Sequence, residues 1–154
     1  MKDTPAGWPR ISACIYYQDP AKAIDWLCSA FGFEVRLKVE GDGGEIHHSE
    51  LTYGEGVVMV GGTEPTAHRP EPTFQPRSPR QLEGANTQGL MLYVDDVDAH
   101  CGRARAAGAT IVVEPKVSDY GEDYWSDKGY QARDPEGHDW WFMERLRNPK
   151  NAKQ

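Results

Sequence analysis

The sequence has few cysteines, no long apolar run and fewer basic than acidic side chains. Its three cysteines, Cys14, Cys28 and Cys101, form no Cys-x-x-Cys pair, so the sequence predicts buried thiols rather than a disulfide framework or a zinc knuckle. No apolar stretch approaches the roughly 20 residues that span a bilayer, and the first residues lack the apolar core of a signal peptide. We therefore expect a cytoplasmic protein with no membrane partner.

The charge balance and the missing catalytic motifs exclude further classes of function. With 24 acidic and 17 basic residues, the net charge is -7, which disfavours nucleic acid or an anionic membrane as a partner and suits a neutral or cationic small molecule. The sequence contains no HExxH motif, no nucleophile elbow and no phosphate-binding glycine loop followed by a helix. Its chemistry has to be sought in the arrangement of single side chains.

The chain contains an internal duplication. Asp19-Pro20 is a helix cap followed by proline at the first helical position, and the helix that it starts ends at Gly32. The same order returns 76 positions later, with Asp95 and Asp96 as candidate caps and a helix end at Gly108. Apolar or alternating strand signals surround both helices, at residues 11–18, 33–39, 46–53 and 57–60, and again at 90–94, 110–113, 130–133 and 138–144. The sequence therefore predicts an α+β fold of two tandem βαβββ modules.

The duplication divides the chain into five parts. They are a lead-in at 1–10, a first module at 11–62, a proline-rich connector at 63–88, a second module at 89–146 and a tail at 147–154. The lead-in has no periodicity but can dock through Trp8. A second irregular segment is expected between Ser118 and Gly129.

The order of these motifs resembles the vicinal oxygen chelate superfamily, the group of glyoxalases, bleomycin resistance proteins and extradiol dioxygenases. The likeness covers roughly residues 11 to 146 and is carried by Asp19-Pro20, by 30–34, 48–51, 94–99 and 106–109, and by 133–138 with Trp140. It implies that each sheet curls around a concave cavity with its helix on the convex side. It also implies a homodimer.

The resemblance further implies a divalent metal, held by one His, Glu or Gln from the first and last strand of each module. Ser12, Gly89, Val60 and Trp141 stand at the four aligned positions, and none is a suitable ligand for such a metal. A shift of one residue brings in only Ile11, Ala13, Met59, Gly61, Leu90 and Phe142. We therefore predict no metal site and no other cofactor.

Without a metal, the inward faces of the strands still offer the lining of a small-molecule pocket. Ligand contacts are expected from aromatic, sulfur and imidazole side chains, at Trp141, Tyr93, Tyr16, His48, Met143 and Trp125. For Trp141 the alternative is a role in filling the cavity or in dimer packing, and Trp140 and Phe142 are assigned to the core. The leading hypothesis is a metal-independent protein that binds a small aromatic or planar compound, for example to sequester an antibiotic.

An enzyme of the same superfamily is the alternative. His48 and Glu50 lie two apart on a strand and point the same way, so the carboxylate could orient the imidazole as a general base. The other interpretation of this pair is a solvated contact at a sheet edge. With Tyr16 as a third candidate, the enzyme would be a lyase, isomerase or thiol transferase that acts on a small molecule. A dimer without any ligand is the remaining hypothesis.

Overall fold

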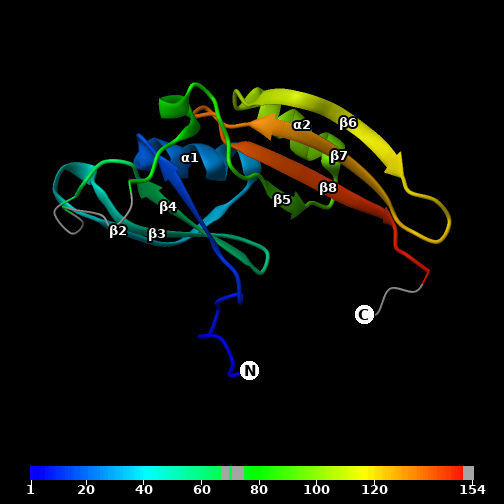
Figure 1. Cartoon of the computed structure of the whole chain (residues 1–154), viewed down its shortest axis with the longest axis horizontal. Coiled ribbons are helices and arrows are strands. Elements are labelled where there is room, and N and C mark those ends of the chain that lie inside the picture. Colours follow the sequence, from blue (N-terminus) through cyan, green and yellow to red (C-terminus); the bar gives the residue numbers. More distant parts are fainter. Residues whose placement is uncertain (67–69, 71–74, 151–154) are drawn as a thin grey trace. The chain divides into compact units, whose positions relative to one another are not determined.

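The computed structural model describes residues 1–66, 70 and 75–150. Contacts divide the chain into two compact units, Met1–Glu83 (unit 1) and Gly84–Gln154 (unit 2). Each unit holds one four-stranded mixed sheet and one α-helix among its described residues (Figure 1). The predicted α+β fold of two tandem βαβββ modules is confirmed.

Unit 1 is built from one helix and a sheet in the order β1-β4-β3-β2. Its elements are β1 (Ala13–Tyr17), α1 (Pro20–Phe31), β2 (Glu34–Glu40), β3 (Ile46–Tyr53) and β4 (Gly56–Gly62), with short 3-10 helices at Asp42–Gly44 and Pro79–Leu82. Strand β1 is parallel to β4, and the other pairs are antiparallel. The outermost strands of this sheet are therefore β1 and β2.

Helix α1 begins and ends where the capping residues predict. The side chain of Asp19 accepts a hydrogen bond from the Lys22 amide at 3.1 Å, which satisfies one of the free N–H groups of the first turn. Gly32 follows the last turn with a φ of 83°, and its N–H donates to the Cys28 carbonyl at 3.2 Å. A residue with a side chain would be strained at this φ.

Unit 2 repeats the arrangement, with a sheet in the order β5-β8-β7-β6. Its elements are β5 (Leu90–Tyr93), α2 (Val97–Ala106), β6 (Thr110–Asp119), β7 (Ser126–Arg133) and β8 (Asp139–Arg147). The Asp96 side chain caps α2 by accepting from the Ala99 amide at 2.9 Å, and Glu144 of β8 accepts from the Val97 amide at 3.0 Å. Neither α1 nor α2 is long and apolar enough to cross a membrane, and no other described helix is either.

The irregular segment predicted at 118–129 is largely wrong. Strand β6 continues to Asp119 and β7 begins at Ser126, so only residues 120–125 connect the two strands. Register shifts between Ile111 and Lys116 interrupt the pairing of β6 with β7, and the predicted strand ended at Val113, before the second shift is complete. Within the predicted connector, 67–69 and 71–74 lie outside the described residues, as does 151–154 of the tail.

Each sheet has a helix face, which packs on its own helix, and an open face on the opposite side. On the helix face of unit 2, Trp140 and Phe142 are fully buried, and the His100 ring of α2 lies 4.3 Å from the Phe142 ring. The helix face of unit 1 is formed by Ile15, Tyr17, Leu51 and Val60, all buried. The assignment of Trp140 and Phe142 to the core is confirmed, and the side chains between them belong to the open faces.

Candidate functional site

The open face of unit 2 carries two aromatic and two thioether side chains on adjacent strands. Pairing of β5 with β8 sets Met91 beside Trp141 and Tyr93 beside Met143. Met91 and Tyr93 are exposed, and Trp141 and Met143 are half-buried. These four residues form what we call the aromatic patch. It is the kind of adaptable apolar surface on which planar ligands stack.

A glycine on the neighbouring strand makes room for the patch. Gly129 of β7 pairs with Met143 of β8, and a Cβ atom built on Gly129 would lie only 2.4 Å from the Met143 sulfur. The thioether therefore lies across the strand where any other residue would place its side chain. The position of Met143 depends on this missing Cβ.

Arg145 extends the patch toward the end of the β6–β7 hairpin. Its Nε donates to Asp127 at 2.5 Å, and its Nη2 donates to the Tyr93 hydroxyl. The guanidinium carbon lies 5.2 Å from the centre of the Tyr93 ring and 5.9 Å from that of Trp125. The hydrogen bond to Asp127, more than any other contact, raises the pKa of Arg145, so the cation is fixed beside two aromatic rings.

The structure thus brings four of the predicted ligand contacts into one cluster: Trp141, Tyr93, Met143 and Trp125. The site residues predicted from the sequence did not include Arg145 or the buried Asp127. A period of two counted onward from Trp141 and Met143 reaches Arg145. The spacing along this strand could therefore have predicted Arg145 as a member of the same face.

The open face of unit 1 carries the other predicted residues, Tyr16, His48 and Glu50. Tyr16 lies on β1 next to Gly61 of β4, where a Cβ atom would come within 3.2 Å of the tyrosine ring. His48 and Glu50 lie on β3, and β4 separates them from β1. Two strand spacings place the backbones of Tyr16 and His48 about 10 Å apart.

Three charged or ionisable side chains on this face form a linked set, which we call the trio: Arg36, Glu50 and His48. One Glu50 oxygen accepts from Arg36 Nε at 2.7 Å, and the other lies 2.9 Å from His48 Nε2. The hydrogen bond with His48 and then the contact with Arg36 hold the pKa of Glu50 below its ordinary value, against the opposing effect of burial. Glu50 is therefore a carboxylate with both oxygens engaged.

These residues do not lie at a sheet edge, as the alternative interpretation placed them, although the His48 side chain is 42% exposed to solvent. Strand β3 lies between β4 and β2, and Glu50 is only 8% exposed. Sequence reasoning missed Arg36 because it sits at a register shift between Val35 and Leu37. A bulge of this kind turns a side chain away from the face that simple alternation assigns to it.

The residues present do not fit the metal that the resemblance implies. Trp141 lies on an open face, as a ligand would, but its indole cannot serve as one. The alignment of Val60 with Trp141 is wrong by one residue, because Val60 is buried on the helix face and Met59 is the counterpart. Among residues 1–66, 70 and 75–150, no group of three His, Cys, Asp or Glu side chains could hold a metal ion.

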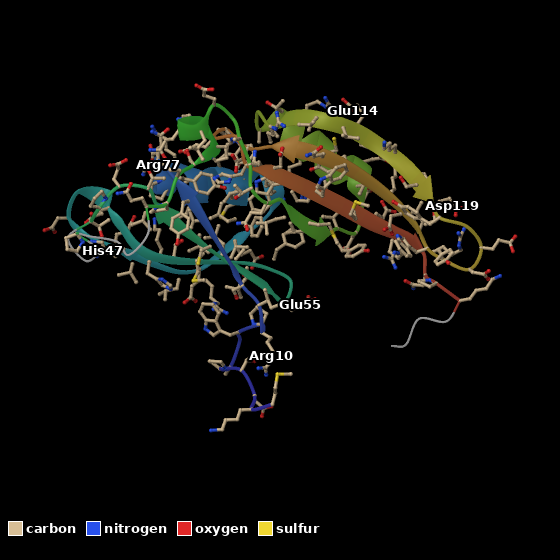
Figure 2. The ribbon with its side chains drawn as sticks, viewed as in Figure 1. Arg10, His47, Glu55, Arg77, Glu114 and Asp119 are labelled. Carbon is tan, nitrogen blue, oxygen red and sulfur yellow. The ribbon has the colours of Figure 1, made fainter. Side chains whose placement is uncertain are left out.

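His47 shows why the two adjacent histidines do not form a site together. Its Nε2 lies 2.7 Å from Glu45, and its ring packs against Gly41 (Figure 2). His48 instead contacts Glu50, since neighbouring residues of a strand point to opposite faces. The two imidazoles therefore have separate partners.

Residues 10–142 match the model of the Glyoxalase/Bleomycin resistance protein/Dioxygenase superfamily. The chain belongs to this superfamily. An uncharacterized protein of Mycobacterium tuberculosis is 30% identical over 132 residues, which cover 86% of this chain and 72% of that protein. The superfamily assignment made from the order of the motifs is confirmed.

Solved structures of other proteins have a similar fold. TioX from Micromonospora sp. ML1 is 32% identical, with a TM-score of 0.66, over 88% of this chain and 95% of TioX. A superfamily member from Sphaerobacter thermophilus is 20% identical, with a TM-score of 0.62, over 86% of this chain and 94% of the other. At that identity, the second match shows the fold alone.

Proposed function

We propose that this superfamily member binds a small aromatic or planar compound on the aromatic patch of unit 2, without a metal, and that an aromatic antibiotic is such a compound. The observation that carries the proposal is the placement of Trp141 and Tyr93, with Met91 and Met143, on one open face. Rings on such a surface stack face to face with a planar ligand, and the thioethers adapt to its outline.

The electrostatics of unit 2 support a neutral or cationic ligand. The guanidinium beside the Tyr93 ring, that of Arg145, is already paired with Asp127. A net charge of -7 disfavours an anionic compound at long range. Selection among neutral and cationic compounds then depends on stacking area and shape.

Trp141 is the residue whose loss tests the proposal most directly. Truncation of a central aromatic anchor to alanine costs about 2 kcal/mol or more, which weakens binding about 30-fold. Calorimetric titration of the full chain with planar aromatic antibiotics, bleomycin included because of the family description, identifies a ligand. Trp141→Ala is then expected to lose that affinity, and Trp141→Phe to keep part of it because a ring remains.

The control is Trp26→Phe, which removes a tryptophan from helix α1 of unit 1. It is expected to bind as tightly as the unchanged protein. If Trp141→Ala retains full affinity for the same compound, the aromatic patch is not the binding surface. Pairing into a homodimer and a cytoplasmic location stay predictions from the sequence.

A further inference from the structure

We propose that the open face of unit 1 carries a general base, His48, which is positioned by Glu50 and Arg36 and removes a proton from a small neutral molecule with an acidic C–H bond. The proposal is independent of ligand binding on the aromatic patch, because all of its residues belong to unit 1. His48 is the proposed catalytic residue. Glu50 and Arg36 are positioning residues.

The contacts of the trio fix the chemistry of the imidazole. Glu50 takes the Nε2 side of His48, so the neutral ring carries its proton on Nε2 and its lone pair on Nδ1. Among residues 1–66, 70 and 75–150, no hydrogen bond reaches this Nδ1, and the His48 side chain is 42% exposed. A base needs such an accessible lone pair and a carboxylate that stabilises the imidazolium formed.

The position of Glu50 depends on Arg36, which is itself held by contacts with the N-terminal lead-in. Arg36 donates from Nε to Glu50 and from Nη1 to the Gly7 carbonyl, and its guanidinium carbon lies 4.6 Å from the centre of the Trp8 ring. The lead-in therefore docks through Trp8, as the sequence suggested. It leaves the arginine little freedom, and a fixed arginine keeps the carboxylate oriented.

Unit 2 shows that this fold does not need the trio. The two sheets share one register: Leu37 pairs with Glu50 on β3 just as Val113 pairs with Gln131 on β7, each after a register shift. The place of Arg36 is taken by Val112, and that of His48 by Gly129. Because the same sheet forms with valine, glutamine and glycine there, stability of the fold alone does not account for the ionic set in unit 1.

The surroundings of His48 suit an apolar substrate. Val39 pairs with His48 and Leu37 with Glu50, and both aliphatic side chains are partly exposed on β2. A bound molecule that covers them displaces water from the imidazole, which strengthens its interactions with charge that develops during proton transfer.

The test uses 5-nitrobenzisoxazole, a planar neutral probe of general bases, with the full chain. Nδ1 takes the proton from carbon, the C–H electron pair forms the nitrile as the N–O bond breaks, and the oxygen leaves as the phenolate. General bases contribute about 10²- to 10⁴-fold, so His48→Gln is expected to lower the rate at least about tenfold. His47→Gln, which changes the adjacent histidine on the other face, is expected to keep it.

Nitrogen NMR of the histidine rings separates a positioning role from a structural one. The neutral His48 ring is expected to be the Nε2–H tautomer in the unchanged protein and in Gln131→Leu, the matched variant in unit 2. In Glu50→Leu, checked for folding by circular dichroism, the two tautomers are expected to mix and the rate to fall. A rate no higher than that of free imidazole, equal rates for the two histidine variants, or mixed tautomers in the unchanged protein would overturn the proposal.

Discussion

Replacement of each of the two adjacent tryptophans of β8 by phenylalanine should affect stability very differently. Trp140 is fully buried, and its Nε1 donates to a carboxylate oxygen of Asp134 at 3.1 Å. Trp141 is half-buried on the open face. We expect Trp140→Phe to destabilise the protein strongly and Trp141→Phe to change its stability little.

The expected cost at Trp140 has two parts. Loss of the hydrogen bond to a carboxylate that is only 4% exposed costs about 1.5–3 kcal/mol. A residual cavity of about 40 Å³, at about 24 cal/mol per Å³, adds about 1 kcal/mol. The sum is about 3 kcal/mol. At Trp141, where the ring is retained and water has access, we expect less than about 1 kcal/mol.

Thermal unfolding followed by far-ultraviolet circular dichroism measures both changes. For a chain of this size, about 3 kcal/mol corresponds to a fall in Tm of about 6–12 °C, against about 3 °C or less for Trp141→Phe. Equal losses at the two positions would refute the assignment of faces. The aromatic patch would then have to be abandoned, because its four members were placed by the same alternation.

Two further predictions concern single contacts in unit 2. Gly129→Ala would bring a Cβ atom within 2.4 Å of the Met143 sulfur, so we expect the flexible thioether to rotate away. The affinity for the ligand is then expected to fall by more free energy than the folding stability. Titration measures the first change in this variant, and thermal unfolding measures the second. Unchanged affinity would show that Met143 takes no part in binding. Asp119 (Figure 2) is bridged by Arg147, and this contact, helped by the Gly121 amide, lowers the pKa of Asp119 from its ordinary 3.8 to about 2. Because the pKa of Asp119 is lower in the folded state than in the unfolded state, its contact with Arg147 contributes stability that is fully present above about pH 4. This contribution is lost as the pH falls toward about 2. The Tm of Asp119→Asn should therefore fall less than that of the unchanged protein between about pH 4 and about pH 2. Equal falls in Tm for the two proteins would contradict the reasoning.

The sequence predicted the elements whose signals are local. Asp19 and Gly32 mark α1 because a cap and a positive φ are properties of one or two residues. Trp140 and Trp141 were assigned to opposite faces because β8 keeps a strict period of two from Asp139 to Met143. The duplication then supplied the fold, since two modules with the same order of caps and strands have few arrangements.

Features that depend on non-local pairing could not be predicted in this way. Arg36 reaches Glu50 only because a register shift in β2 turns it toward the open face. Strand β6 continues from the predicted 110–113 segment to Asp119, past register shifts between Ile111 and Lys116. The misplacement of Val60 by one residue also reflects non-local pairing, because the position of each β4 residue is set by its pairing with β1.

The two open faces share one register but differ in chemistry. At the position after the register shift, unit 1 has Glu50 opposite an aliphatic residue and unit 2 has Gln131, which cannot carry the charge that an imidazolium or guanidinium needs. Gly129 stands in unit 2 where unit 1 has His48, and its missing side chain leaves the space that Met143 fills. These differences separate an ionisable face in unit 1 from an aromatic face in unit 2, so the proposed proton transfer and the proposed ligand binding can be tested independently of each other.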